Sequence, residues 1–214
     1  MTVMIQSGPG SVVMDDVSWD YYSRTLKELG PSSGTKVIYD QGRMEIVTHS
    51  DKHERIKTVI SRLLEMYAVE MEIEITGLGM LTMRRRKLGR GLEPDECYYV
   101  QTPAAPLTEG EFNLSVNPPP DLAIEVEISE TVISKIPIYA ALKVKEVWRY
   151  VGGRITVLHL DPKGEYRPKR KSLAFPELDI QRFNKFVAQS LVEGDLKAIR
   201  ALREWVQSAK GRGK

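Results

Sequence analysis

The hydrophobic pattern of the chain predicts several helices, of which one is clear from spacing alone. Over residues 51–68 the apolar side chains recur at alternating steps of three and one, at Ile56, Val59, Ile60, Leu63, Leu64 and Tyr67. This spacing places them on one side of an α-helix. Ser50 or Asp51 is a suitable N-cap. Capping and breaker residues predict further helices over residues 19–29, over about 137–143, and from about Asp179 onward.

Alternating or continuous apolar segments predict strands between these helices. Two hairpins are expected, one turning at Gln41-Gly42 and one at Gly152-Gly153. Their strands cover residues 36–40 and 43–48, and residues 146–151 and 154–160. Further strands are expected over residues 71–83, 97–100 and 121–128, and near Tyr166.

Interleaved helices, strands and hairpins predict an α/β fold with helices against a mixed sheet. A length of 214 residues fits a single domain. We expect a core of about residues 18–190, preceded by a flexible lead-in at 1–17. Residues 191–214 are expected to form a helical tail that ends in basic residues.

Composition narrows the class of protein without naming a function. Lys and Arg number 31 against 29 Asp and Glu, and the net charge of +2 excludes a polycation that binds DNA by bulk charge. The single cysteine, Cys97, excludes a disulfide scaffold and a Cys-rich zinc module. The N-terminal segment is a poor signal peptide, and no apolar run is long enough to span a bilayer. We therefore expect a cytoplasmic protein without a membrane partner.

Acidic side chains share one face of the strand predicted at residues 121–128. Alternation turns Leu122, Ile124, Val126 and Ile128 to one face, and Asp121, Ala123, Glu125 and Glu127 to the other. Such carboxylates must be exposed to solvent, paired with cations, or bound to metal, because burying them unpaired is costly. An exposed sheet face explains the pattern equally well. Asp121 lies roughly 13 Å from Glu125 along a strand, so a second ligand for one Mg²⁺ would have to come from a neighbouring strand.

Asp95 is the candidate for this second ligand. It follows Pro94 at the start of a predicted strand, although Pro-Asp pairs are also common in turns. A Pro-Asp followed by a Glu on an apolar alternating strand is the order found in metal-dependent phosphodiester hydrolysis. There, two hard oxygen ligands hold Mg²⁺, and a nearby Lys orients water and offsets developing charge.

Four segments carry a resemblance to a known family: GRMEIVTHSDKHERI, RGLEPDECYYV, PPDLAIEVEIS and KIPIYAALKVKEVWRY. From Gly42 to about Phe186 the chain resembles the Uma-two family of endonuclease-like proteins, within the PD-(D/E)xK restriction-endonuclease-like superfamily. The resemblance implies a restriction-endonuclease-like mixed β-sheet core flanked by helices, with extra hairpins and a C-terminal helix. It also implies a metal-dependent DNA endonuclease.

The resemblance assigns roles to individual residues. Asp95 and Glu125 match the metal ligands, for Mg²⁺ with Mn²⁺ able to substitute. The motif lysine is missing, because Glu127 stands in its place, and Lys135 is the residue placed to take over its role.

Three more residues are candidates for the site near the start of the predicted helix. His53 stands on the apolar stripe at a helix N-terminus, where it is either a satisfied boundary residue or a contact to phosphate or water. Glu45 and Glu54 are candidates for an additional acid. We rank Glu45 first because a helix turns Glu54 about 100° from His53, so the two should not point together.

The expected partner is duplex DNA, and a second copy of the chain is a candidate because nucleases often pair to cut both strands. The basic cluster Arg84–Lys87 with Arg90 is either a solvated strand end or a phosphate clamp that leads into Asp95. Tyr139 is expected in the core. Two alternatives to an active nuclease stay open. One is a nuclease fold that has lost its chemistry and binds nucleic acid or protein, and the other is a structural role in which the acids pair with Arg84–Arg86.

Overall fold

The computed structural model describes residues 5–8, 10–30, 34–100, 112, 114–128 and 131–211, and its strands form two sheets. The first sheet is antiparallel, and the tight turn Gln41-Gly42 joins its two central strands as predicted. In spatial order its strands are β1 (Ile5–Gly8), β2 (Ser11–Met14), β4 (Arg43–Thr48), β3 (Thr35–Asp40), β7 (Arg90–Leu92) and β6 (Met83–Arg85).

The second sheet is mixed, as expected from the sequence. Its strands β9 and β10 pair in parallel, while its other described pairs are antiparallel. The helix α3 (Lys135–Leu142) makes the crossover between β9 and β10. In spatial order the strands are β12 (Tyr166–Lys169), β11 (Arg154–Leu160), β10 (Glu146–Val151), β9 (Leu122–Glu127), β8 (Glu96–Tyr99) and β5 (Thr76–Gly77).

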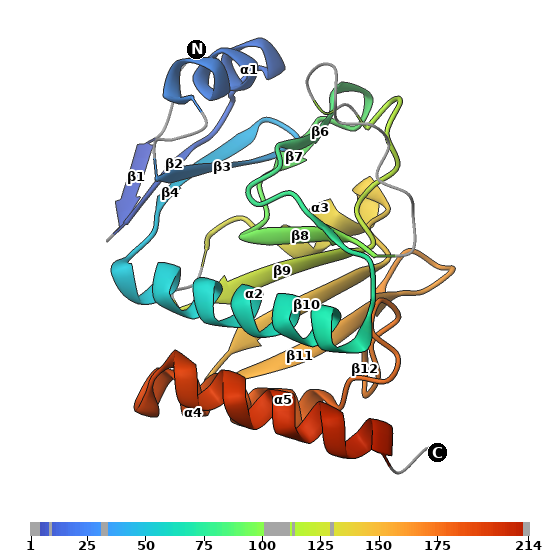
Figure 1. The fold of residues 1–214 in the computed structure, drawn as a ribbon. Helices are drawn as coiled ribbons and strands as arrows, with labels where there is room; N and C mark the ends of the chain where they lie inside the picture. Colours follow the sequence, from blue (N-terminus) through green and yellow to red (C-terminus); the bar gives the residue numbers. More distant parts are fainter. Residues whose placement is uncertain are drawn as a thin grey trace.

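Helices cover both faces of the second sheet. One face is covered by α2 (Asp51–Met71), α4 (Ile180–Glu193) and α5 (Asp195–Gly211) (Figure 1). Their apolar side chains form one buried cluster with Leu122, Ile124 and Val126 of β9. On the other face, α3 packs in a second cluster with Ala123 of β9 and with residues of the first sheet. The alternation predicted for β9 is therefore confirmed, and α3 lies where the two sheets meet. A third cluster joins α1 (Trp19–Leu29) to the first sheet, and a short 3₁₀ helix covers Arg86–Leu88.

Short-range sequence features correctly predicted where several helices and strands begin or end. The Ser50 side chain caps α2 by accepting a hydrogen bond from the His53 amide, and Asp179 caps α4. The helix at 19–29 and both strands of the 146–160 hairpin have the predicted bounds. These agreements come from features that depend on neighbouring residues alone.

The structure corrects one predicted strand and describes part of the predicted lead-in. The strand expected over residues 71–83 is mostly absent: α2 runs on to Met71, and only Thr76–Gly77 pairs before β6 begins. Here Ile73 and Ile75 pack against the large core cluster without joining a ladder, so apolar content alone was misleading. The lead-in expected at 1–17 contains β1 and β2, which extend the first sheet; residues 1–4 and 9 lie outside the described part.

The last helix contributes to the core. Ala198, Leu202 and Val206 of α5 are buried in the cluster that α2 and α4 share. The division into lead-in, core and tail stays a prediction, and residues 212–214 lie outside the described part. Among the described residues, no helix is long and apolar enough to cross a membrane.

Candidate active site

Asp95 and Glu125 occupy facing positions on neighbouring strands. In the antiparallel pair β8–β9, Glu96 stands opposite Ile124, so the same register places Asp95 opposite Glu125. The Asp95 amide donates to the Ile124 carbonyl at 3.2 Å, and the Val126 amide donates to Asp95 Oδ2 at 2.6 Å. Opposite residues of a ladder project from the same face with Cβ atoms about 5 Å apart. Both side chains are fully buried.

Each of the two acids is paired with its own lysine. Lys36 of β3 donates to Asp95 Oδ1 and, at 2.7 Å, to the Pro94 carbonyl. Lys135, the first residue of α3, donates to Glu125 Oε2 at 2.6 Å. Glu125 Oε1 accepts a further hydrogen bond from the hydroxyl of Tyr139. Two sheets and α3 thus bring two carboxylates and two ammonium groups into one buried cluster.

Burial and charge pull the pKa values of the two acids apart. Burial favours protonation of Asp95, but the hydrogen bond from His53 and the charge of Lys36 hold its pKa well below the usual range. Burial raises the pKa of Glu125, an effect that Lys135 reduces and that Asp95 reinforces. Asp95 therefore stays ionised, while Glu125 takes up a proton more readily and is the stronger base of the two.

The lysine pKa values also diverge. Burial lowers the pKa of Lys36, and the nearby carboxylates offset this only in part. Burial also disfavours the charge on Lys135, but Glu125 and Asp95 outweigh it and raise the pKa of Lys135 above its ordinary value. Lys135 is thus held as an ammonium group against Glu125.

Two histidines lie against Asp95 at the start of α2. His53 Nε2 lies 3.0 Å from Asp95 Oδ2, and His49 Nδ1 lies 3.8 Å from Asp95 Oδ1. The two rings lie with their centroids 3.7 Å apart and their planes tilted by 45°. Mainly because of burial, the pKa of His49 is lowered to about 4, so its imidazole is neutral at physiological pH.

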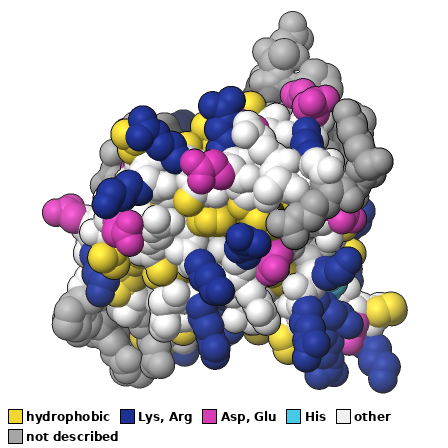
Figure 2. Space-filling model, turned by 60° about the horizontal axis from the view of Figure 1, so that its bottom comes forward, with side chains coloured by type: hydrophobic (Ala, Val, Ile, Leu, Met, Phe, Trp, Pro, Cys, Tyr) yellow, Lys and Arg dark blue, Asp and Glu magenta, His cyan; other side chains and the backbone are white. Residues whose placement is uncertain are grey.

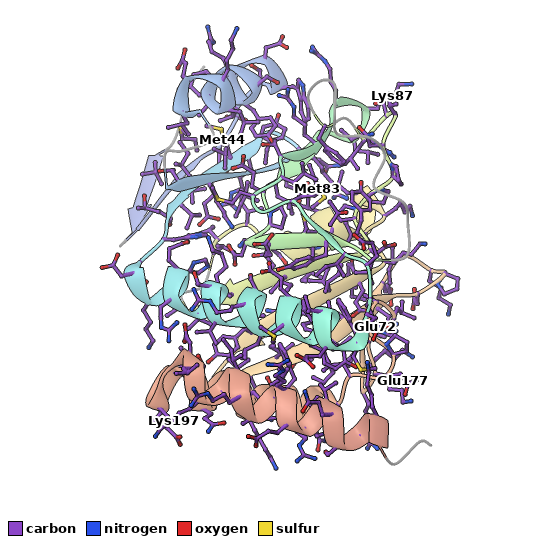
Figure 3. The ribbon with its side chains drawn as sticks, in the orientation of Figure 1. Met44, Glu72, Met83, Lys87, Glu177 and Lys197 are labelled. Carbon is purple, nitrogen blue, oxygen red and sulfur yellow. The ribbon has the colours of Figure 1, made fainter. Side chains whose placement is uncertain are left out.

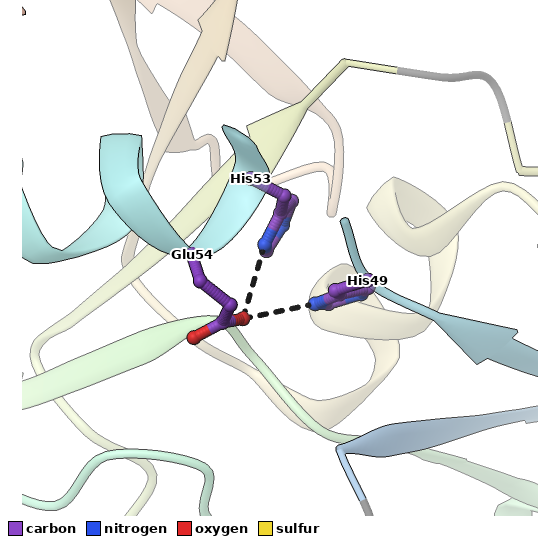
Figure 4. Close-up of side chains that lie close together, drawn as sticks. All are labelled: His49, His53 and Glu54. Carbon is purple, nitrogen blue, oxygen red and sulfur yellow. Dashed lines mark hydrogen bonds and ion pairs between the residues drawn. The ribbon is translucent and has the colours of Figure 1, made fainter. Parts of the chain in front are cut away.

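Glu54 turns toward these histidines, contrary to the sequence-based expectation. Its Oε1 lies 3.3 Å from His53 Nδ1 and 3.5 Å from His49 Nδ1 (Figure 4). The expectation was wrong because it considered only the direction in which each side chain leaves the helix. The Glu54 side chain, 47% exposed, is long enough to bend back over its neighbour.

Glu45 has a supporting position. Its carboxylate, fully buried in β4, accepts hydrogen bonds from the amides of Val132 at 3.1 Å and Ile133 at 2.8 Å. These amides belong to the segment that leads into α3. Glu45 therefore fixes the start of the helix that carries Lys135, and its described partners are backbone groups.

Glu127, at the usual position of the motif lysine, is engaged elsewhere. Arg149 of β10 donates to it through two parallel hydrogen bonds, at 2.7 and 2.5 Å. Two arginines at and just after the end of β6 have other partners too: Arg85 donates to the Leu114 carbonyl, and Arg86 pairs with Asp20. The alternative in which Arg84–Arg86 neutralise the two acids is therefore wrong, since Lys36 and Lys135 do so.

Comparison with known proteins identifies the family. The family model of Uma2, described as "Putative restriction endonuclease", matches residues 19–187. The chain belongs to the Uma2 family. It is also similar to a crystal structure of a "putative nuclease belonging to DUF820" from Anabaena variabilis, with 18% identity and a TM-score of 0.48. That match covers 71% of this chain and 90% of the other. No curated protein matches the chain.

The basic segments of this Uma2 protein do not merge into one surface. Lys87 and Lys197 stand far apart in Figure 3, near the upper edge and the lower edge of the molecule. Figure 2 shows Lys and Arg side chains in several groups on the face it presents, with acidic and hydrophobic side chains between them. This scattered distribution agrees with the small net charge of +2. It indicates that an anionic partner would contact separate basic groups.

The two acids have the donor chemistry that Mg²⁺ requires. Carboxylate oxygens are the ligands preferred by this ion. A carboxylate offers about four lone-pair positions. From the described residues, Asp95 accepts three hydrogen bonds, from Lys36, His53 and Val126, and Glu125 accepts two. Both acids therefore keep acceptor capacity for a cation.

Three residues of this cluster were not found from the sequence: Lys36, His49 and the hydroxyl of Tyr139. A single Lys at the start of a predicted strand gives no signal, because such lysines are usually solvated. Tyr139 is buried as expected, yet its hydroxyl binds Glu125. His49 could have been predicted, because it stands four residues before His53 with the Ser50 cap between them. The turn of the chain at this cap brings the two histidines close together.

Proposed function

We propose that this Uma2 protein is a metal-dependent DNA endonuclease that hydrolyses phosphodiester bonds by a PD-(D/E)xK-type mechanism. The family match supports a nuclease in general. The observation that carries the specific mechanism is the facing register of Asp95 and Glu125 with Lys135 held on Glu125. Two acids from adjacent strands and one ammonium group are the parts that this chemistry needs.

In this proposal Asp95 and Glu125 hold Mg²⁺, or Mn²⁺ in its place. When bound, the ion polarises the phosphoryl group and lowers the pKa of attacking water. Lys135 offsets the negative charge that develops on the phosphate, and it does so as an ammonium group that is already desolvated. Tyr139 orients Glu125, and His53 orients Asp95.

Glu45, the remaining residue predicted from the sequence, positions Lys135. Its two bonds to the segment before α3 keep Lys135 over Glu125. We propose duplex DNA as substrate and cytoplasm as compartment. A second copy of the chain as partner for double-strand cleavage stays a prediction.

Plasmid cleavage tests the proposal. Supercoiled plasmid is incubated with protein and Mg²⁺ or Mn²⁺, with and without chelator. We expect nicking that chelator abolishes and that falls at least about 100-fold in Glu125→Ala, a loss of about 2.7 kcal/mol in transition-state stabilisation. Glu127→Ala is the matched control, because Glu127 lies two residues along the same strand and pairs with Arg149. Equal nicking by wild type and Glu125→Ala would reject the proposal.

A nuclease fold without chemistry is the second candidate. It is favoured by one observation, the absence of the motif lysine at position 127. Such a module would retain DNA or protein binding and show no cleavage with either metal ion. Calorimetric titration with Mg²⁺ separates the two, because an active site requires ion binding that disappears in Asp95→Asn.

A further inference from the structure

We propose that His49, His53 and Glu54 form a zinc site at the N-terminus of α2, next to the Asp95–Glu125 pair and distinct from it. The inference goes beyond the proposed nuclease function and does not depend on it. One donor atom from each of the three residues lies within 4.8 Å of the other two. Nδ1 of both histidines faces Oε1 of Glu54 (Figure 4).

The separations match those of ligands around one zinc ion. Zinc holds nitrogen and oxygen ligands at about 2.1 Å, so two tetrahedral ligands lie about 3.4 Å from each other. Glu54 Oε1 is 3.3 Å from His53 Nδ1 and 3.5 Å from His49 Nδ1. Both distances to Glu54 thus suit one ion, while the two imidazole rings, whose centroids are 3.7 Å apart, would have to spread to receive it.

Two neighbouring groups fix these donor atoms in place. Asp95 Oδ2 lies 3.0 Å from His53 Nε2, which leaves Nδ1 of that ring for a ligand. Lys57 Nζ holds the other oxygen of Glu54, Oε2, at 2.5 Å. Metal-binding histidines commonly use their second nitrogen on a carboxylate in this way, which sets the tautomer and the ring orientation. The arrangement around the three donors thus resembles the outer shell of a metal site.

His53 lies between two carboxylates, with Nε2 3.0 Å from Asp95 Oδ2 and Nδ1 3.3 Å from Glu54 Oε1. A ring with protons on both nitrogens donates to both acids. A ring with its proton on Nε2 alone presents a lone pair at Nδ1, which together with Glu54 Oε1 offers two donor atoms to a metal ion.

The donor set selects the class of ion. Two imidazoles and one carboxylate suit zinc and related transition metals, whereas Mg²⁺ prefers a shell of oxygen ligands. Three protein ligands leave a fourth position for water or a phosphate oxygen, as in catalytic zinc sites. Glu54 is the exposed member of the set, so the ion can enter from solvent.

Metal titration of the full chain tests the site. We expect calorimetry to show one high-affinity Zn²⁺ per chain, and Co²⁺ to give the intense visible bands of a tetrahedral site. His49→Gln and Glu54→Gln should each weaken Zn²⁺ binding at least 30-fold. His159→Gln is the matched control, since His159 is the third histidine of the chain and lies in β11. Glu125→Ala should leave Zn²⁺ affinity within threefold of wild type, whether or not it abolishes cleavage.

A measurement on the wild-type protein removes any dependence on folding of the variants. Imidazole ¹⁵N resonances are recorded before and after addition of one equivalent of Zn²⁺. We expect the Nδ1 resonances of two histidines to shift and those of the third to stay. No Zn²⁺ binding at 100 µM ion, unchanged binding in His49→Gln, or unshifted imidazole resonances would each overturn the proposal, and a proton shared by His53 and Glu54 would then explain the contact.

Discussion

The Nζ atom of Lys135 lies 2.6 Å from Oε2 of Glu125, although ten residues separate the two in the chain. The strand β9 ends at Glu127, and the chain continues into α3. This helix packs on the face of the sheet to which Ala123 and Glu125 point. The lysine at the start of that helix therefore reaches Glu125. In the proposed mechanism it takes the role of the motif lysine that would stand at position 127.

Lys135→Met should abolish cleavage and destabilise the protein. Without its ammonium group, Glu125 is a fully buried acid whose one remaining hydrogen bond from the described residues comes from Tyr139. Removing one partner of a buried ion pair typically costs about 3–5 kcal/mol. Because burial already raises the pKa of Glu125, lowering the pH protonates it more readily than an ordinary Glu and relieves the unpaired charge. Urea unfolding should thus show a larger loss at pH 8 than at pH 5.

The double variant Lys135→Met/Glu125→Gln separates stability from activity. It removes both charges, so it should be more stable than Lys135→Met while remaining inactive on plasmid DNA. Recovery of cleavage in the double variant, or full cleavage by Lys135→Met, would show that Lys135 has no part in the chemistry.

Glu127→Lys should not improve cleavage, although it restores the superfamily motif. The new lysine would face Arg149, which now donates two hydrogen bonds to Glu127. Loss of this partly exposed pair and a like-charge contact should together lower stability by about 1 kcal/mol. Urea unfolding and plasmid cleavage are compared with Glu127→Gln, which removes the pair without adding a charge. A tenfold gain in cleavage by Glu127→Lys alone would mean that Lys135 does not substitute for the motif lysine.

The elements that sequence predicted best are those set by short-range patterns. The α2 stripe, its Ser50 cap and the 146–160 hairpin need only neighbouring residues to be recognised. The failure at residues 71–83 has the opposite cause. Ile73 and Ile75 are apolar because they contact the core formed by distant segments, and pairing of a strand also requires a partner edge. Periodicity carries no information about that edge.

The candidate site divides in a similar way. Asp95 and Glu125 stand in local motifs, so the sequence could propose them. Lys36 reaches the site only because β3 of the first sheet lies against the loop before β8, a contact between residues 59 positions apart. Nothing near Lys36 in the sequence signals that contact.

Glu45→Gln should weaken the segment that leads into α3. The Gln side chain offers one acceptor atom in place of two, so one of the Val132 and Ile133 amides loses its acceptor, and the Ile133 amide is the buried one. An unsatisfied buried donor costs about 1–3 kcal/mol. Hydrogen exchange at these two amides should accelerate, and kcat should fall about tenfold with Mg²⁺ affinity unchanged, because Lys135 is less well positioned.

Glu74→Gln is the control for this prediction, since Glu74 is exposed. It should change neither exchange nor cleavage. If Glu45→Gln instead reduced Mg²⁺ affinity, Glu45 would be a ligand and not a positioning residue.

The stability of the metal-free protein should fall as the pH drops from about 6.5 to about 4. His49 has a pKa of about 4 in the folded protein against about 6.5 in the unfolded chain, mainly because burial disfavours its charged form. Between these values the unfolded chain binds more protons, so stability rises with pH there and is lost on acidification. The full shift corresponds to about 3 kcal/mol. Unfolding in urea with chelator present, at half-unit pH steps, measures the slope.

His49→Gln should flatten this part of the profile, because the amide does not titrate. His159→Gln serves as the comparison. The contribution of Asp95 occupies a separate window: its depressed pKa gives stability above about pH 4 that is lost as the pH falls through the folded pKa. The loss of stability below about pH 4 should therefore persist in His49→Gln. Identical slopes for wild type and His49→Gln between pH 4 and 6.5 would show that His49 is not held neutral by its burial beside Asp95.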